Sequence, residues 1–105
     1  CECICLRINS KGIKEMMLNS QLLVNASPVG MKESDPCVIN PKFLHKNLCV
    51  FDIVYNNDTK LLRTCRKKGI KAVGGLSMLL YQGMRTFELW TGKRPPVEVM
   101  RKALQ

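Results

Sequence analysis

Two adjacent glycines, with a glutamine seven residues after the second, form the pattern in this sequence with the clearest chemical potential. Gly74 and Gly75 carry no side chain, so at the start of a helix they let a ligand approach free backbone N–H groups closely. Gln82 can donate and accept hydrogen bonds with a hydroxyl-rich substrate. Each residue has an ordinary alternative, because Gly-Gly also makes a tight strand-to-helix turn and most helical glutamines are only solvated. The pattern therefore indicates a ligand site only where other polar residues converge on it.

Tyr55 follows a nearly continuous apolar stretch, 48–54, and Asp52 lies within it. The Tyr55 hydroxyl can bond a substrate carboxylate or hydroxyl, although a tyrosine at a strand end is as often the edge of a core. Asp52 interrupts the apolar stretch, and a buried carboxylate requires hydrogen-bond partners. We interpret Asp52 mainly as an acceptor that orders a neighbouring loop, with a general base as the alternative.

An alternation of strands and helices must position these residues. Apolar runs at 22–24, 48–54 and 70–73 are typical of strands, and the second is continuous enough for a central strand covered on both faces. Helical spacing follows the second and third runs. This order predicts an α/β fold with a parallel sheet, whose strands end together at one edge where ligands bind. The residues at those ends are Asn25–Pro28, Tyr55–Asn56 and Gly74–Gly75.

Local signals define further elements. Thr59 is typical of a helix N-cap, Gly69 and Gly92 of helix ends, and Pro95-Pro96 of the start of a last helix. The stripe of the helix after Thr59 is formed by Leu61, Leu62 and Cys65. We also expect a strand over Cys3–Ile8, a helix over Lys11–Asn19, and core positions at Met84, Phe87 and Trp90.

Composition describes one small domain or a piece of one. The chain has 105 residues and six cysteines, too few residues for a multidomain enzyme and enough for a modest core without disulfides. Cys1, Cys3 and Cys5 alternate as on one face of a strand, and with a single histidine, His45, no metal cluster is expected. We expect buried or half-buried reduced thiols and a cytoplasmic location. Because the first methionine is Met16, we expect the tail of a longer protein.

The net charge of +9 makes nucleic-acid binding one function to consider. Basic residues surround the helix after Thr59, but its apolar stripe points inward, so the charges fill an ordinary solvated face. No aromatic residue interleaves with them to stack on bases. No apolar run approaches the ~18 residues of a membrane helix. The sequence therefore predicts neither a nucleic-acid nor a membrane partner.

Three motifs together resemble the C-terminal part of the NADP-dependent shikimate dehydrogenases. Residues 23–31 (LVNASPVGM) are similar to that family's "NATPxGM" segment, and residues 50–56 (VFDIVYN) to its "xxDxxYNP" segment. Residues 75–92 are similar to its "GLxMLxxQ…FxxWTG" tail. The resemblance covers about residues 22–105 and implies a partial Rossmann-like parallel sheet with flanking helices, ending in two C-terminal helices.

The resemblance implies roles for single residues. Tyr55 and Gln82 would bind the substrate, shikimate or 3-dehydroshikimate. The residues that would border the NADP cofactor are Ile53 and Gly75 through their backbones, Met78 beside the nicotinamide, and Ala26 and Ser27 where the cofactor crosses the sheet. No catalytic acid–base residue and no metal ligand is implied in this chain.

Departures from the family's motifs indicate which part of the enzyme this chain would form. Asn57 stands where the family usually has Pro, and no Gly-rich turn for a pyrophosphate occurs. Residues 1–105 would then be the C-terminal portion of an NADP-binding domain, without the Gly-rich turn and the N-terminal substrate domain. Residues 74–105 would form a helical segment that returns toward the substrate domain. The missing N-terminal part of the enzyme is the implied partner, with a homodimer as a further one.

The leading hypothesis is therefore a fragment of an enzyme that reduces 3-dehydroshikimate to shikimate with NADPH in aromatic amino acid biosynthesis, inactive as an isolated chain. The resemblance leaves quinate and NAD as alternatives to shikimate and NADP. A non-catalytic remnant or binding module of the same half-fold is the rival reading, followed by a basic nucleic-acid-binding domain.

Overall fold

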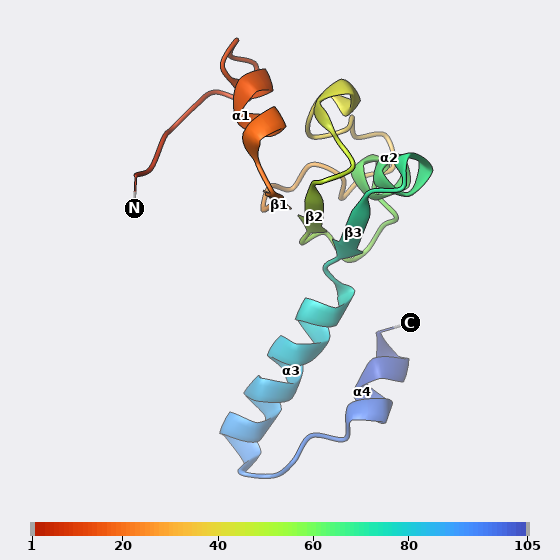
Figure 1. The fold of residues 1–105 in the computed structure, drawn as a ribbon. Coiled ribbons are helices and arrows are strands. Elements are labelled where there is room, and N and C mark those ends of the chain that lie inside the picture. The colour runs from red at the N-terminus through yellow and green to blue at the C-terminus, as the bar shows by residue number, and fades with distance from the viewer. Residues whose placement is uncertain (1, 105) are drawn as a thin grey trace.

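The computed structural model describes residues 2–104 and contains one three-stranded parallel sheet (Figure 1). The strands, adjacent in the order of the chain, are β1 (Leu22–Asn25), β2 (Cys49–Asp52) and β3 (Lys71–Gly74). The helices are α1 (Ile13–Asn19), the 3-10 turn η1 (Pro41–Phe43), α2 (Lys60–Lys68), α3 (Leu76–Thr91) and α4 (Val97–Ala103). The expected α/β class, with a parallel sheet and two C-terminal helices, is confirmed.

The core lies on the face of the sheet that α2 covers. Strand register places Leu23, Val50 and Ala72 side by side on this face. Leu61 and Cys65 of α2 are fully buried against it, as the apolar stripe of the sequence predicts. The core cluster is completed by α1, η1 and the connecting loops and consists of Met17, Ile39, Leu44, Leu48, Val50, Leu61, Cys65 and Ile70.

Helix α2 begins and ends at the expected residues. The Thr59 hydroxyl accepts the Leu62 N–H at 3.2 Å, which satisfies one of the free donors of the first turn. Gly69 ends the helix with φ +67°, and the Ile70 N–H donates to the Cys65 carbonyl oxygen at 2.9 Å. The cap fixes where α2 starts relative to β2, only seven residues earlier.

The opposite face of the sheet is exposed, so the prediction of a central strand covered on both faces is wrong for this chain. Leu22 is 60% exposed, Val24 47% and Val73 57%, and Phe51 between them is half-buried. Helices α3 and α4 extend away from the sheet in place of covering this face (Figure 1). The apolar residues of β2 are suited to burial on both faces of the sheet. Within the described residues, other parts of the chain cover only one of these faces.

The predicted strand over Cys3–Ile8 is also wrong. These residues have no regular structure and are exposed, because an isolated extended segment without a pairing strand gains no ladder hydrogen bonds. Cys3, Cys5 and Cys49 are exposed free thiols, and Cys1 lies outside the described residues. The expected burial holds for Cys65, which is fully buried, and for the half-buried Cys37. Burial raises the pKa of the Cys65 thiol, which keeps it protonated and inert.

Helices α3 and α4 pack against one another beyond the sheet edge. A Cβ on Gly83 would lie 3.2 Å from the Met100 methyl group, so the two helices approach closely there. Leu80 is the buried residue of α3, and Met84 and Phe87 are half-buried. Trp90 is 85% exposed, which contradicts its expected core position, because a pair of helices has only one inner face. No helix within residues 2–104 is long and apolar enough to cross a membrane.

Candidate functional site

The carboxyl ends of β1 and β2 open into a groove of about 290 Å³. The loop after β1 forms one wall and the segment after β2 the other, and the lining residues are Ala26, Ser27, Pro28, Met31, Ile53, Val54, Tyr55 and Asn56. Four residues singled out in the sequence, Ala26, Ser27, Ile53 and Tyr55, therefore line one concavity. An adjoining hollow of about 330 Å³ shares residues 54–56 with this groove and extends to Gly74, Gly75 and Leu76. Tyr55 borders both spaces.

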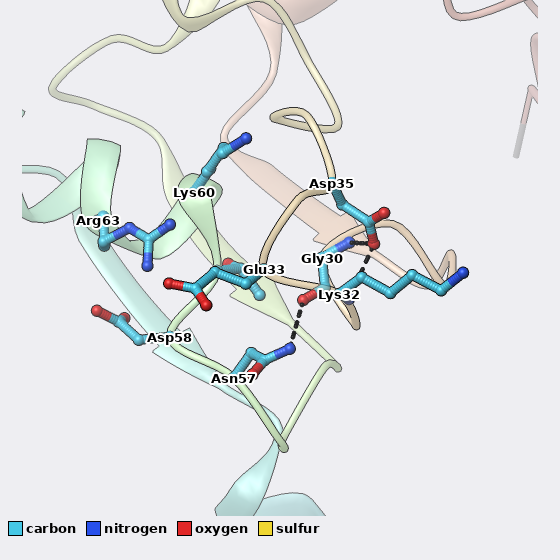
Figure 2. A pocket seen from close by; sticks show the side chains of 9 residues that line it. Gly30, Lys32, Glu33, Asp35, Asn57, Asp58, Lys60 and Arg63 are labelled. Atoms are coloured by element: carbon cyan, nitrogen blue, oxygen red, sulfur yellow. Dashed lines mark hydrogen bonds between the residues drawn. The ribbon is translucent and has the colours of Figure 1, made fainter.

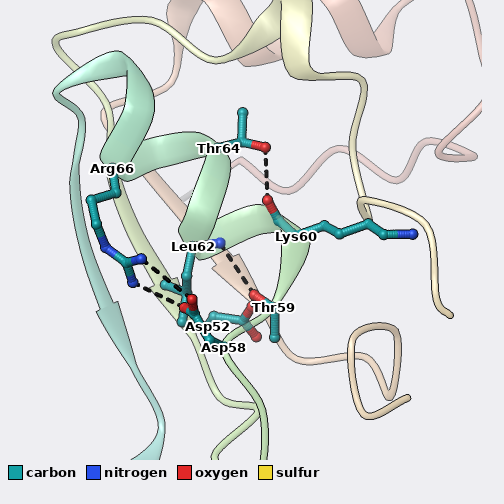
Figure 3. Close-up of polar contacts among 7 residues, drawn as sticks. All are labelled: Asp52, Asp58, Thr59, Lys60, Leu62, Thr64 and Arg66. Atoms are coloured by element: carbon teal, nitrogen blue, oxygen red, sulfur yellow. Dashed lines mark hydrogen bonds and ion pairs between the residues drawn. The ribbon is translucent and has the colours of Figure 1, made fainter. Parts of the chain in front are cut away.

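A buried carboxylate holds the two strand ends together below the groove. Asp52 has no exposed surface, and its Oδ1 accepts from Asn25 Nδ2 at 2.9 Å and from the Val54 N–H at 3.2 Å. Its Oδ2 accepts from the Thr59 hydroxyl at 2.6 Å (Figure 3). Asp52 thus joins β1, β2 and the cap of α2, which agrees with its interpretation as a structural acceptor. With both oxygens engaged, it does not face the groove as a base.

The wall at Ser27 is ordered by its own side chains. Asn25 Oδ1 accepts from the Ser27 hydroxyl at 2.6 Å and from the Ser27 N–H at 3.1 Å. The Ser27 hydroxyl oxygen in turn accepts the Val29 N–H at 3.3 Å. Since the Ser27 proton is already donated to Asn25, this hydroxyl shapes the wall and offers a ligand only its remaining lone pair.

Gly75 starts α3 directly against the end of β2. A Cβ built on Gly75 would lie 2.1 Å from the Ile53 carbonyl oxygen, and the Gly75 N–H donates to the Val54 carbonyl oxygen at 3.2 Å. Gly74 is less restricted, with the Leu62 side chain 3.2 Å from its Cβ position. The second glycine of the pair is therefore required for close backbone approach, while the first is not.

The remaining two predicted residues lie on α3, outside the linings of the groove and the adjoining hollow. Met78 is half-buried in the first turn, and Gln82 is exposed in the second. Figure 1 shows that α3 extends away from the sheet, which takes Gln82 away from the groove. The structure therefore brings together five of the seven predicted residues, Tyr55 itself included; the other four are Ala26, Ser27, Ile53 and Gly75.

A third, more polar hollow of about 240 Å³ lies between the loop after β1 and the start of α2 (Figure 2). Two of its carboxylates, Asp35 and Asp58, are engaged within the protein. Asp35 accepts the Gly30 N–H at 2.9 Å and the Lys32 N–H at 3.0 Å, and Asp58 pairs with Arg66 at 2.9 Å. The pKa of Asp58 is lowered by the hydrogen bond from Arg66. Since these groups organise the protein itself, we regard this hollow as structural. Within the described chain, no cluster of three or more His, Cys, Asp and Glu could hold a metal ion.

Lowering the pH is expected to release Asp35 from its loop. Hydrogen bonds from the Lys32 and Gly30 N–H groups lower the pKa of Asp35, with Lys32 and Lys60 as nearby charges. The stabilisation is present above the ordinary Asp pKa of about 3.9 and is lost as the pH falls through the lower folded pKa. In NMR titrations, the amide protons of Gly30 and Lys32 should shift with a midpoint below that value. Asp35→Asn should remove the transition, and a midpoint at or above about 3.9 would contradict this account.

Sequence reasoning missed the residues that shape the loop after β1. Gly30 has φ +110°, and a Cβ there would lie 2.8 Å from Thr59 Cγ2, so the position requires glycine. The signals were the loop composition of residues 28–30 and the glycine of the motif at residues 23–31. Asn56 and Asn57 donate their side-chain N–H groups to the carbonyl oxygens of Gly30 and Met31 in this loop.

Comparisons with known proteins agree with the resemblance. Residues 75–105 match the family described as "Shikimate 5'-dehydrogenase C-terminal domain". The chain is 43% identical over 95 residues to a shikimate dehydrogenase (NADP(+)) of Methanosarcina mazei, a match that covers 89% of this chain and 34% of that protein. The chain spans about a third of the length of the curated relatives it matches.

Solved structures give the same result. A shikimate dehydrogenase of Aquifex aeolicus matches with a TM-score of 0.79 and 37% identity over 88% of this chain and 34% of that one. A quinate dehydrogenase of Corynebacterium glutamicum in complex with NAD matches with a TM-score of 0.80 and 32% identity over 88% of this chain and 33% of that one. The predicted resemblance to shikimate dehydrogenases, in sequence and in Rossmann-like fold, is confirmed.

Proposed function

We propose that this chain is part of an enzyme that reduces 3-dehydroshikimate to shikimate with NADPH. The chain matches about a third of the length of the shikimate dehydrogenases to which it is similar. The observation that carries the proposal is the convergence of Ala26, Ser27, Ile53, Tyr55 and Gly75 on one sheet edge. In parallel sheets this edge is where ligands bind. The names of the matching relatives support the proposed reaction, and the convergence of these residues supports the proposed position of the ligand site.

In this proposal, Tyr55 and Gln82 hold the substrate. The Tyr55 side chain is exposed between the groove and the adjoining hollow, so its hydroxyl is free to bond a substrate oxygen. Gln82 is exposed on α3, where its amide can donate and accept with a ring hydroxyl. Both residues orient the substrate, and the proton transfer would use residues outside this chain.

The residues around Gly75 fit the nicotinamide end of the cofactor. When bound, NADP(H) supplies the hydride. A groove of about 290 Å³ is at the lower limit of small-molecule sites, which suits the ring end of a dinucleotide and not its whole length. Ile53 and Gly75 lie backbone against backbone where β2 ends and α3 begins, Ala26 and Ser27 line the groove on the side of β1, and Met78 lies in the first turn of α3.

We further propose that residues 1–105 form the C-terminal portion of the NADP-binding domain and that residues 74–105 return toward the substrate domain. Large apolar side chains remain exposed on the open sheet face and on the terminal helices: Leu22, Val24, Val73, Leu89, Trp90 and Val99. Apolar patches of this kind are typical of protein contact sites. We assign this surface to the remaining part of the enzyme. Free thiols at the described cysteines fit the proposed cytoplasmic location.

The sharpest test is a chimera in which residues 22–105 replace the matching third of the Methanosarcina mazei enzyme. The chimera should reduce 3-dehydroshikimate with NADPH. Gln82→Ala should lower kcat/KM by roughly 10- to 100-fold, because one or two hydrogen bonds to the substrate are lost, each worth about 0.5–1.5 kcal/mol.

Gln21→Ala is the matched control, because Gln21 is exposed and lies before β1, at the opposite end of the strand from the site. A chimera that folds but binds neither substrate nor cofactor would favour the non-catalytic remnant. If Gln82→Ala and Gln21→Ala gave equal kcat/KM, the assignment of Gln82 would be wrong while the reaction itself would stand.

A further inference from the structure

The two walls of the groove are joined at two levels. At the base, the Asn25 side chain donates to Asp52 at 2.9 Å, and the Ile53 N–H donates to the Asn25 carbonyl oxygen at 3.1 Å. At the outer level, the walls consist of irregular chain, the loop after β1 and the segment after Val54. Backbone ladder bonds end with the strands, so side chains must set the spacing of the walls there.

Two neighbouring asparagines make the outer connection. Asn57 Nδ2 donates to the Gly30 carbonyl oxygen at 3.3 Å (Figure 2) and also to that of Met31. Asn56 Nδ2 donates to the Met31 carbonyl oxygen at 3.3 Å. Asn57 is half-buried and bonds two acceptors, whereas Asn56 is exposed and bonds one. Asn57 is therefore the stronger of the two connections, because water competes less with its bonds.

The acceptors of Asn57 are held in place from the other side. Gly30 lies against Thr59, with 2.8 Å between its Cβ position and Thr59 Cγ2, and its N–H is held by Asp35. Thr59 is itself bonded to the buried Asp52. The Gly30 carbonyl oxygen thus belongs to a rigid part of the loop, beside the groove residue Met31, and Asn57 fastens the Tyr55 segment to it from the polar hollow.

We propose that Asn57 is a positioning residue that sets the width of the groove and thereby the place of Tyr55, without touching the ligand. This inference rests on the proposed function of the groove. Asn57 stands where the resembling pattern has Pro, and a prolyl residue has no side-chain N–H to donate. The connection is therefore a property of this chain.

NMR spectroscopy of the ¹⁵N-labelled chain tests the inference without activity. Asn57→Ala and the isosteric Asn57→Asp both remove the donors and should shift the amide signals of Met31 and Tyr55 while leaving those of Val50 in place. Asn47→Ala is the matched control, because Asn47 is an exposed loop residue before β2. Unchanged Met31 and Tyr55 signals in both Asn57 variants would overturn the inference.

Binding of NADP⁺ to the chimera described above separates this inference from the proposed function, because the chimera restores the parts of the cofactor site that this chain lacks. The unsubstituted chimera should bind NADP⁺, and the apparent Kd should rise about fivefold in both Asn57 variants and stay unchanged in Asn47→Ala. An equal Kd in all four chimeras would overturn the positioning role. If the folded chimera did not bind NADP⁺, the proposed function would fail, and the ligand-free spectra of the chain would still decide the role of Asn57.

Discussion

Gly75→Ala is expected to destabilise the protein by at least about 3 kcal/mol. The added methyl group would lie 2.1 Å from the Ile53 carbonyl oxygen, and because the obstacle is backbone, no side-chain rotation relieves the overlap. Overpacking in a well-packed region costs about 1–3 kcal/mol and more where the backbone must move. At about 4 °C per kcal/mol or more, the midpoint of thermal unfolding should fall by at least about 12 °C.

Gly74→Ala is the matched control for this prediction. The added methyl group there would meet the end of the flexible Leu62 side chain at 3.2 Å, which can move by a few tenths of an ångström. We expect a change in stability of less than about 1 kcal/mol by circular dichroism melting. Equal melting points for the two variants would show that α3 can start elsewhere than against β2.

Asp52→Ala is expected to cost about 3–5 kcal/mol, measured by urea unfolding. The substitution leaves the Thr59 hydroxyl and the Val54 N–H without an acceptor, and the Asn25 amide keeps only its bond to the Val29 carbonyl oxygen. A buried donor left without a partner costs about 1–3 kcal/mol. The loss of Thr59's partner also loosens the cap of α2, so the helix signal should fall together with the tertiary signal.

Asp58→Ala provides the comparison, six residues further along the chain. Asp58 also bonds a neighbour, Arg66, but the pair is 47% and 69% exposed, and such surface pairs contribute little. Its removal should change stability by well under 1 kcal/mol. A large effect at Asp58, or a small one at Asp52, would contradict the view that burial decides how much each carboxylate contributes.

Local signals predicted most of the fold because they act over a few residues. Thr59 and Gly69 bound α2 as expected, since a cap needs only the turn beside it. The strands of the sheet were recognisable because apolar runs between turn residues leave few alternatives. The errors at Cys3–Ile8 and Trp90 have one cause, namely that periodicity reports what a segment can bury and not whether a neighbour is present to cover it.

The candidate site was predictable where it depends on strand ends and not where it depends on loops. Parallel strands place their carboxyl ends together by geometry, so Ser27, Tyr55 and Gly75 had to converge. The bonds from Asn57 to Gly30 and Met31 join residues that are 27 and 26 positions apart, respectively. No pattern of spacing identifies such a pair, because loop conformation depends on contacts that form only in the folded chain.

The junction at Gly75 also gives α3 the properties of a lever. A single residue connects β3 to a helix of 16 residues, and this residue is held by the Val54 carbonyl oxygen and packed against Ile53. At 1.5 Å per residue the helix is about 24 Å long, so a rotation of about 5° at its base moves the far end by about 2 Å. Because Trp90 lies near the far end of α3, the direction in which Gly75 starts the helix decides where Trp90 is placed relative to the sheet edge.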